Sequence, residues 1–174
     1  GLNAMLVDST ALPEQAVRDI LASAFQSAGQ RCSALRCLYV QEDVAETVTG
    51  MLFGAMDDLA LGDPWQLATD VGPVIDTDAQ SAIAAYIAEA RAEGRVLKEL
   101  PAPPGTFIGP AVLRVAGIKQ MPREIFGPVL HIATFRASEI DAVTDAVNAT
   151  GYGLTFGLHS RIDDRVQRIV DRLH

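Results

Sequence analysis

Two short segments of the chain hold the side chains best suited to do chemistry. Residues 29–34 (GQRCSA) place Cys32 among small neighbours, directly after an amphipathic segment and directly before an apolar one. Residues 122–128 (PREIFGP) place Glu124 and Phe126 in a turn made by proline and glycine. A thiolate is a nucleophile, and a carboxylate fixed in such a turn can accept hydrogen bonds from the hydroxyls of a sugar. The two segments therefore suggest a thiol nucleophile and a site for a sugar-containing ligand.

Cys32 also has a simpler interpretation, because a free cysteine is most often a small buried side chain. Its small neighbours favour the nucleophile, since they leave room for a substrate carbon to approach the thiol. Cys37 lies in the middle of the apolar run 35–40 (LRCLYV), where we expect it to pack in the interior. A redox dithiol is disfavoured, because Cys-x4-Cys is not the Cys-x-x-Cys spacing of such sites.

A nucleophilic cysteine needs a neighbouring base or a lowered pKa. The three histidines have no spacing that relates any of them to Cys32, and Arg31 is its only adjacent cation. A base must therefore come from the tertiary fold or from chain outside this sequence. Two cysteines and three scattered histidines also lack the spacing of metal ligands, so we predict no metal site.

Glu124 has a simple interpretation too, as a solvated acid in a surface loop. Its loop leads straight into an apolar run, and in open parallel sheets the loops at strand ends form the ligand crevice. Phe126 offers a flat apolar surface for a ring, and a carboxylate there suits the hydroxyls of a nucleotide ribose. Residues 151–153 (GYG) lack the third glycine of a G-x-G-x-x-G phosphate loop. Most of a dinucleotide site would therefore lie outside this chain.

Composition narrows the class of protein. The chain has 174 residues, of which 49% are hydrophobic and 21% charged, as in an ordinary globular domain. Its net charge of −8, with 14 Lys and Arg scattered among 22 Asp and Glu, argues against a nucleic-acid partner. No apolar run approaches the roughly 20 residues of a transmembrane helix. Two cysteines are too few for a disulfide framework, so we expect a cytoplasmic location. A start at Gly1 without Met suggests a piece of a larger protein.

Apolar residues recur at helical spacing in some segments and form short continuous runs in others. The expected strands cover residues 4–7, 35–40, 96–97, 107–115, 129–135 and 154–160, with a short extended piece at 71–75. The expected helices run from Pro13 to 28, over 44–61, from Asp76 or Thr77 to 92, from a Ser138 cap to 149, and over 162–173. The basic stretch 161–172 is interpreted as the solvated face of the last helix. Helices between strands imply right-handed crossovers, so the predicted fold class is α/β: one domain with a mainly parallel, doubly wound sheet and helices on both faces.

Three motifs carry a resemblance to the aldehyde dehydrogenase superfamily. They are Gly-Gln-Arg-Cys at 29–32, Glu-Ile-Phe-Gly-Pro at 124–128, and Asn148 followed by Gly-Tyr-Gly-Leu at 151–154. Their order and spacing resemble the catalytic domain of that family over essentially all of residues 1–174. Residues 2–15 (LNAMLVDSTALPEQ) narrow the resemblance to the L-glutamate γ-semialdehyde (1-pyrroline-5-carboxylate) dehydrogenase part of bifunctional proline utilization A enzymes.

The resemblance implies a role for each singled-out residue. Cys32 would attack the aldehyde to give a thiohemiacetal, hydride would pass to NAD, and water would release glutamate from the resulting thioester. Glu124 would bind the nicotinamide ribose and Phe126 would pack near the nicotinamide. Ser33 would hold the substrate carboxylate. The resemblance further implies a homo-oligomeric parent protein in proline catabolism, with FAD in a separate proline dehydrogenase domain.

Other parts of the family's machinery have no counterpart in this sequence. In the family, the catalytic glutamate, the oxyanion asparagine and the dinucleotide-binding domain lie upstream of these motifs, and a carboxylate-anchoring loop and an oligomerisation strand lie downstream. We therefore expect the fragment alone to be inactive. Another aldehyde dehydrogenase specificity is one alternative. Two other classes are also open: a non-catalytic α/β binding domain, and a different thiol enzyme such as an acyl-transferring one.

Overall fold

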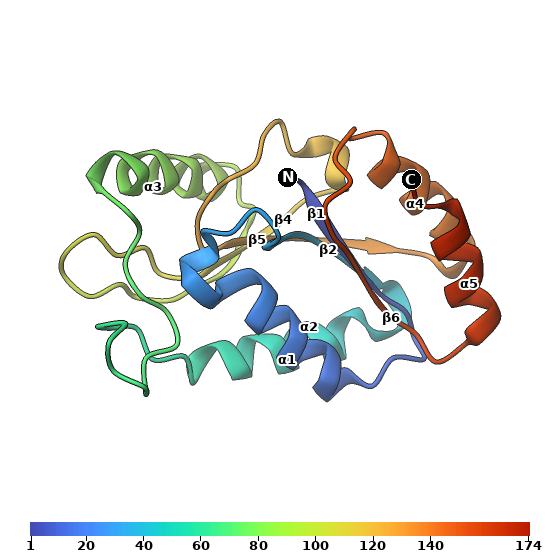
Figure 1. Cartoon of the computed structure of the whole chain (residues 1–174), viewed down its shortest axis with the longest axis horizontal. Coiled ribbons are helices and arrows are strands. Elements are labelled where there is room, and N and C mark those ends of the chain that lie inside the picture. The colour runs from blue at the N-terminus through green and yellow to red at the C-terminus, as the bar shows by residue number, and fades with distance from the viewer.

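A single sheet of six strands forms the centre of the molecule, in the order β3-β4-β5-β2-β1-β6 (Figure 1). The computed structural model describes every residue of the chain, 1–174. The strands are β1 (Asn3–Val7), β2 (Leu35–Gln41), β3 (Val96–Glu99), β4 (Ala111–Arg114), β5 (Val129–Phe135) and β6 (Phe156–His159). Every neighbouring pair is parallel except β3 and β4, which pair antiparallel at one edge. The mainly parallel sheet predicted from the sequence is therefore confirmed.

Helices cover both faces of this sheet. They are α1 (Pro13–Phe25), α2 (Glu42–Asp57), α3 (Thr77–Ala92), α4 (Ile140–Asn148) and α5 (Asp163–Arg172). Figure 1 shows α1 and α2 on one side of the strands and α3 and α4 on the other, with α5 beside α4. None of these helices combines the length and the apolarity needed to cross a lipid bilayer. The doubly wound arrangement is confirmed.

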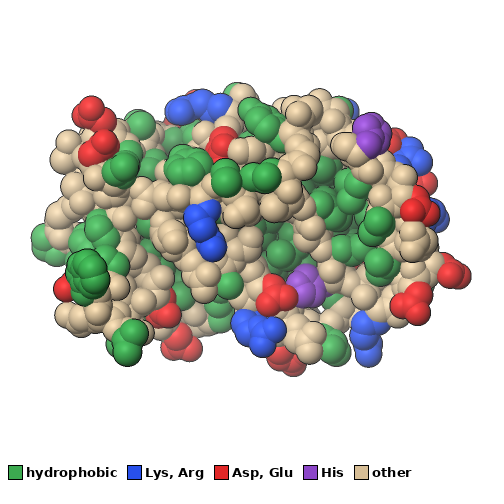
Figure 2. Space-filling model, in the orientation of Figure 1, with side chains coloured by type: hydrophobic (Ala, Val, Ile, Leu, Met, Phe, Trp, Pro, Cys, Tyr) green, Lys and Arg blue, Asp and Glu red, His purple; other side chains and the backbone are tan.

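Alternating strand residues feed two apolar clusters. Leu38 belongs to a cluster of 28 buried residues that includes side chains of α1 and α2. Its neighbour Tyr39 belongs to a cluster of 14 that includes side chains of α4 and α5. Successive side chains of a strand point to opposite faces of a sheet, so β2 contributes to the interior on both sides. On the outside, the face drawn in Figure 2 shows Lys and Arg side chains interspersed with Asp and Glu.

Some expected elements are shorter than their sequence pattern. Of the expected strand 107–115, only Ala111–Arg114 pairs as β4. The chain before it is irregular because Gly109 packs on the main chain of Leu100, where a Cβ would lie 1.8 Å from the carbonyl oxygen. The second helix ends at Asp57 rather than at residue 61. Leu61 instead forms an isolated parallel bridge with Val71, the only paired part of the expected piece 71–75.

One expected helix cap is correct and another is wrong. Asp76 caps α3, because its Oδ1 accepts a hydrogen bond from the Ala79 N–H at 2.7 Å. Ser138 does not cap α4, which begins only at Ile140 after a 3₁₀ turn. The carboxylate of Glu139 makes the side-chain hydrogen bond at the start of this turn, accepting from the Arg136 N–H at 2.8 Å. A carboxylate with a longer reach has displaced the hydroxyl that the sequence pattern favoured.

A buried carboxylate joins the carboxyl ends of β1 and β6. Asp8 is fully buried, and its Oδ1 accepts hydrogen bonds from the N–H (2.7 Å) and the hydroxyl (2.6 Å) of Thr10. Its Oδ2 accepts from the Ser160 hydroxyl at 2.5 Å and from Arg165 Nη1 at 2.7 Å. Burial alone would raise the pKa of Asp8, but these four donors outweigh it and lower the pKa below its ordinary value.

The arginines of α5 are therefore not simply a solvated face, and that expectation is wrong in part. Arg165 reaches the buried Asp8, and Arg172 donates two hydrogen bonds to Asp145 of α4, at 2.6 and 2.7 Å. These contacts fasten the last helix to the rest of the domain. Sequence periodicity could not reveal them, because Asp8 lies at the far end of the chain.

Asp8→Asn should lower the free energy of unfolding by about 2–3 kcal/mol at about pH 7, since the amide removes a charge from a buried hydrogen-bonded network. The native pKa of Asp8 is lowered, so ionised Asp8 stabilises the fold above its unfolded pKa of about 3.9. That contribution is lost as the pH falls through the native pKa. Urea titrations at several pH values should show the difference between the two proteins shrinking in acid. Asp141→Asn, at a pair exposed on both sides, is the control and should change stability by less than about 1 kcal/mol. A pH-independent loss at Asp8 would contradict the assignment.

Candidate functional site

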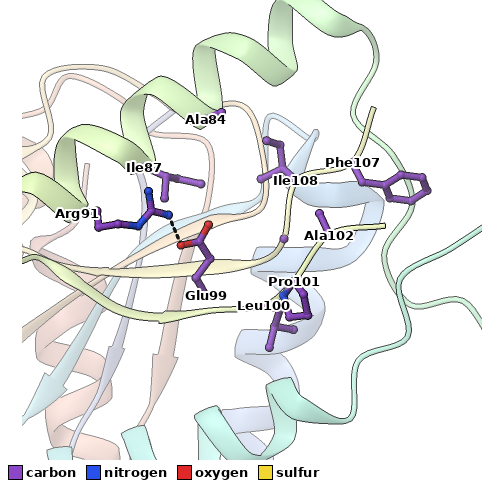
Figure 3. A pocket seen from close by; sticks show the side chains of 10 residues that line it. Ala84, Ile87, Arg91, Glu99, Leu100, Pro101, Ala102, Phe107 and Ile108 are labelled. Carbon is purple, nitrogen blue, oxygen red and sulfur yellow. Dashed lines mark hydrogen bonds and ion pairs between the residues drawn. The ribbon is translucent and has the colours of Figure 1, made fainter. Parts of the chain in front are cut away.

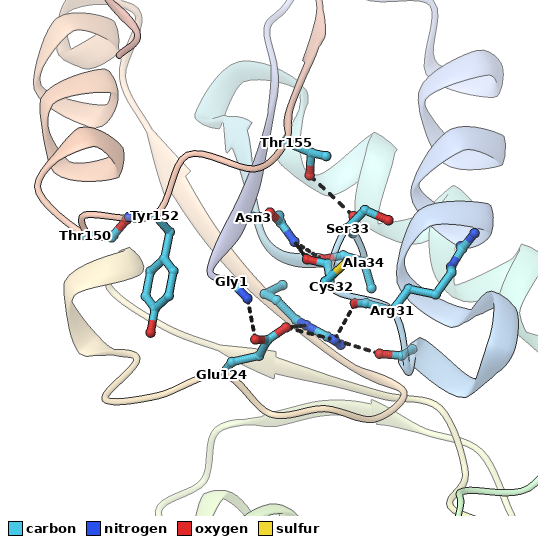
Figure 4. Close-up of polar contacts among 12 residues, drawn as sticks. Gly1, Asn3, Arg31, Cys32, Ser33, Ala34, Glu124, Thr150, Tyr152 and Thr155 are labelled. Atoms are coloured by element: carbon cyan, nitrogen blue, oxygen red, sulfur yellow. Dashed lines mark hydrogen bonds and ion pairs between the residues drawn. The ribbon is translucent and has the colours of Figure 1, made fainter.

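The two chemically suggestive segments lie at one edge of the sheet (Figure 4). Residues 29–34 lead into β2 and residues 122–128 lead into β5, and these strands are parallel neighbours with Cys37 opposite His131. Loops that precede neighbouring parallel strands must meet at the same edge. This is the amino edge, whereas open α/β sheets usually bind ligands at the carboxyl edge. The two loops therefore meet at strand ends as expected, but at the opposite end of the strands from the general rule.

A left-handed turn delivers the chain to Cys32. After α1 ends, Ser27, Ala28 and Gly29 have φ angles of 56°, 52° and 66°. Gly29 also touches the other loop, because a Cβ at this position would lie 2.1 Å from the carbonyl oxygen of Gly127. Glycine is therefore required at position 29 for two reasons: its positive φ and the close contact between the two loops.

Hydrogen bonds from Asn3 fix the main chain around Cys32. The Asn3 side-chain Nδ2 donates to the carbonyl oxygens of Cys32 (2.7 Å) and Ala34 (2.8 Å). The Thr155 hydroxyl donates to the carbonyl oxygen of Ser33 at 3.3 Å. Sequence reasoning missed Asn3, and the available signal was a polar residue beginning an otherwise apolar run. The backbone is thus held from one side while the Cys32 side chain stays exposed.

The two cysteines have opposite environments. Cys37 is fully buried in β2, and burial raises its pKa to about 12. It is the interior packing residue that the sequence predicted. Arg31 is directed away from Cys32, since its Nη2 donates to the carbonyl oxygen of Ala22 in α1 at 3.0 Å (Figure 4).

The histidines are engaged elsewhere. His131 is buried, and burial lowers its pKa to about 4. In the neutral ring, Nδ1–H donates to the carbonyl oxygen of Arg36 at 2.9 Å and Nε2 accepts from the Tyr86 hydroxyl at 2.8 Å. His159 lies beside Asp19 and His174 beside Asn148. None of the three histidines is hydrogen bonded to Cys32, so none of them is placed as its base.

Arg36 connects the two loops, and sequence reasoning missed it. Its fully buried guanidinium donates to the carbonyl oxygens of Gly29 (2.6 Å) and Arg31 (3.2 Å) on the Cys32 side. On the other side it donates to Gly127 O at 3.0 Å and to Glu124 Oε1 at 3.2 and 3.3 Å. Burial lowers the pKa of Arg36 and the charge of Glu124 opposes that shift. The signal in the sequence was a charged residue inside an apolar strand.

Glu124 and Phe126 form the outer part of this arrangement. The Glu124 side chain is 20% exposed, and its Oε2 contacts the amino group of Gly1. The Phe126 ring is also accessible, since this residue is 47% exposed. The Arg36 Cζ lies 5.3 Å from the centre of the Phe126 ring. The loop thus presents a partly accessible carboxylate next to an accessible aromatic ring.

Two cavities differ in their relation to these loops. A pocket of about 530 Å³ lies between α3 and the segment 99–109, with Arg91 and Glu99 paired at 2.5 Å (Figure 3). None of its lining residues belongs to either loop. A smaller pocket of about 220 Å³ is lined by the hydroxyl residues Ser23, Ser33 and Thr155. Only the smaller pocket borders the loop of Cys32.

Brief iodoacetamide treatment of the folded chain should modify Cys32 far faster than Cys37. Cys32 is exposed and Cys37 is buried with a raised pKa, and only an accessible thiolate reacts quickly. Peptide mapping by mass spectrometry measures both sites in one sample, and the same treatment in denaturant provides the control in which both react. Preferential labelling of Cys37 in the folded chain would contradict this placement.

Gly29→Ala should destabilise the chain by about 3–5 kcal/mol, because the new Cβ collides with the backbone of Gly127. Gly94→Ala is a matched control: Gly94 also has a positive φ of 69°, but a Cβ there meets nothing within 4 Å. The control should lose only the conformational cost of about 1–2 kcal/mol. Urea titration gives both values, and equal losses would show that the two loops do not meet at Gly29.

Known proteins resemble the whole chain. The profile of the aldehyde dehydrogenase family matches residues 1–174. A bifunctional protein PutA from Klebsiella aerogenes is 45% identical over 178 residues, covering 97% of this chain and 14% of that protein. A 1-pyrroline-5-carboxylate dehydrogenase from Geobacillus kaustophilus is 36% identical, covering all of this chain and 34% of its own length. The chain thus spans about a seventh of the first relative and a third of the second.

A crystal structure confirms the fold assignment. The structure of a proline utilization A variant from Bradyrhizobium japonicum superposes with a TM-score of 0.97 at 48% identity, over 100% of this chain and 18% of that one. The resemblance inferred from the cysteine and glutamate motifs is therefore confirmed over the whole sequence. The chain belongs to the aldehyde dehydrogenase family.

Proposed function

We propose that the protein containing this chain oxidises L-glutamate γ-semialdehyde to glutamate with NAD, and that residues 1–174 are its nucleophile-bearing catalytic domain. One observation carries the proposal: the loop of Cys32 and the loop of Glu124 and Phe126 meet at one edge of the sheet, bridged by Arg36. An exposed thiol and a partly exposed carboxylate beside an aromatic ring are the groups that a dehydrogenase of this kind requires. The names of the PutA and 1-pyrroline-5-carboxylate dehydrogenase relatives support the substrate.

Cys32 supplies the nucleophile in this proposal. Its sulfur forms a C–S bond to the aldehyde carbon while the π electrons of the C=O bond move onto the oxygen, and uptake of the thiol proton by that oxygen gives a thiohemiacetal. With NAD bound, that carbon would give up its hydride to the cofactor and the hydroxyl proton to solvent, which would leave a thioester. Addition of water to the thioester then gives the carboxylic acid and returns the thiol. The backbone held by Asn3 keeps the sulfur in place during these steps, and the Cys32 N–H helps to hold the developing oxyanion.

Glu124 and Phe126 fit the nicotinamide half of the cofactor. NAD, when bound, supplies the acceptor for the hydride. The Glu124 carboxylate can accept hydrogen bonds from the ribose hydroxyls, and the accessible Phe126 ring offers a surface for the nicotinamide. Arg36 occupies Oε1 of Glu124, so the ribose hydroxyls would bind at Oε2, in place of the Gly1 amino group that contacts it.

Ser33 and its surroundings fit the substrate carboxylate. Ser33 follows the nucleophile directly, and it lines the pocket that also contains the hydroxyls of Ser23 and Thr155. A hydroxyl that donates to a carboxylate contributes about 1.5–3 kcal/mol. Simple aliphatic aldehydes have no carboxylate and cannot use this contact.

The remaining properties of the complete protein are part of the same proposal. The description of the PutA relatives as bifunctional supports a second activity in the complete chain, which we propose to be an FAD-dependent proline dehydrogenase. Both cysteines are free thiols, which suits a reducing cytoplasm. We also propose that the complete enzyme is a homo-oligomer.

Ser33→Ala in the complete enzyme should lower kcat/KM for glutamate semialdehyde roughly ten- to a hundredfold, the loss of one hydrogen bond to a charged group. Propanal should be much less affected. NADH formation measures both substrates, and Ser81→Ala is the control because the Ser81 hydroxyl only donates within α3. Equal losses for the two aldehydes would remove the glutamate-semialdehyde assignment while keeping an aldehyde dehydrogenase.

Cys32→Ser in the complete enzyme should abolish NADH formation. Continued NADH formation by this variant would favour a non-catalytic role for this domain or a different chemistry.

A further inference from the structure

We infer that Arg36 is a positioning residue that sets the nucleophile loop and the cofactor loop relative to each other, so that NAD affinity and Cys32 reactivity depend on the same guanidinium. The inference rests on the proposed function, because it assigns Glu124 and Phe126 to the cofactor and Cys32 to the substrate. Arg36 itself would contact neither the cofactor nor the substrate. It acts through the main chain on one side and through a carboxylate and an aromatic ring on the other.

The hydrogen bonds of Arg36 divide between the two loops. Nη2 donates to Gly29 O at 2.6 Å and to Arg31 O at 3.2 Å, which are main-chain groups within three residues of Cys32. Nη1 donates to Gly127 O at 3.0 Å, one residue after Phe126. A planar guanidinium presents its donors in a fixed fork, so moving one loop against the other breaks at least one of these bonds.

The pairing with Glu124 extends the connection to a side chain that faces the cofactor. Glu124 Oε1 accepts from both Nε (3.3 Å) and Nη2 (3.2 Å) of Arg36. The guanidinium is fully buried, and a buried cation requires a counter-charge. Glu124 is that counter-charge, so the carboxylate is held in one orientation by a constraint stronger than that on a solvated loop acid.

The Phe126 ring is held by the same group. Arg36 Cζ lies 5.3 Å from the ring centre, within the range of a cation–π contact. Phe126 is otherwise half-exposed. One guanidinium therefore orients both side chains that are proposed to meet the nicotinamide and ribose.

Lysine cannot replace this arrangement. The ammonium of a lysine keeps the charge but carries its three donors on one nitrogen, whereas Arg36 reaches acceptors on both loops through three different nitrogens.

Arg36→Lys in the complete enzyme should raise KM for NAD about tenfold or more and change the rate of Cys32 alkylation at least threefold. Glu124→Gln should raise KM for NAD by a similar factor. Since both substitutions break the same ion pair, the double variant should raise KM for NAD by less than the product of the two single effects.

Arg172→Lys is the matched control, because Arg172 makes a similar two-bonded pair with Asp145, far from both loops on α5. It should leave KM for NAD and Cys32 alkylation unchanged. Arg36→Gln, which keeps an amide donor, is the second variant should Arg36→Lys fail to fold. All rates are to be measured well below each variant's melting temperature.

The outcomes separate this inference from the proposed function. An unchanged KM for NAD in Glu124→Gln sinks the cofactor role itself. A raised KM in Glu124→Gln with parent values in Arg36→Lys overturns the positioning role alone. So do multiplicative effects in the double variant, or an unchanged alkylation rate. Failure of both Arg36 variants to fold would assign the residue to stability instead.

Discussion

A buried guanidinium has to be neutralised and hydrogen bonded, and Arg36 is the place where this requirement shapes the molecule. Its acceptors are main-chain carbonyl oxygens of two loops and the carboxylate of Glu124. Moving either loop away would leave a charge in the interior without a partner, at a cost of several kcal/mol. The two loops are therefore bound to a common geometry by electrostatics rather than by apolar packing.

The parallel sheet makes this contact possible. β2 and β5 are neighbours with matched register, so the loops that precede them begin at the same level of the sheet. The helices on both faces provide the burial that raises the cost of an unpaired charge. At the opposite edge, Asp8 plays the corresponding part, since its four donors come from Thr10, Ser160 and Arg165. One buried cation and one buried anion thus join distant segments at the two ends of the strands.

The same packing gives the two thiols different chemistry within a distance of five residues. Cys37 points into the interior from β2, and burial raises its pKa to about 12. Cys32 lies in the loop before the strand, with its main chain held by Asn3 and its side chain exposed. The strand therefore marks a boundary between an inert thiol and an accessible one.

The sequence alone determined the fold class and the motifs of the family. Helical periodicity, short apolar runs and turn residues indicated an α/β chain, and the runs around Cys32 and Glu124 identified the family that the comparisons confirm. The burial of Cys37 also followed from local pattern, because a run of six residues of which five are apolar is typical of an interior strand in an α/β chain. These properties depend on residues close together in sequence.

Only the tertiary structure decided which residues hold the site together. Arg36 and Glu124 are 88 positions apart, Asp8 and Arg165 are 157 apart, and no periodic pattern relates either pair. The Ser138 cap was predicted wrongly, because the carboxylate of Glu139 takes that role. The strand predicted over residues 107–115 was too long, because Gly109 packs on the main chain of Leu100. Local propensity sets what each segment tends to form, whereas desolvation of a charge depends on everything packed around it. That is why most helices and strands could be predicted from the sequence, whereas the contact between the two loops could not.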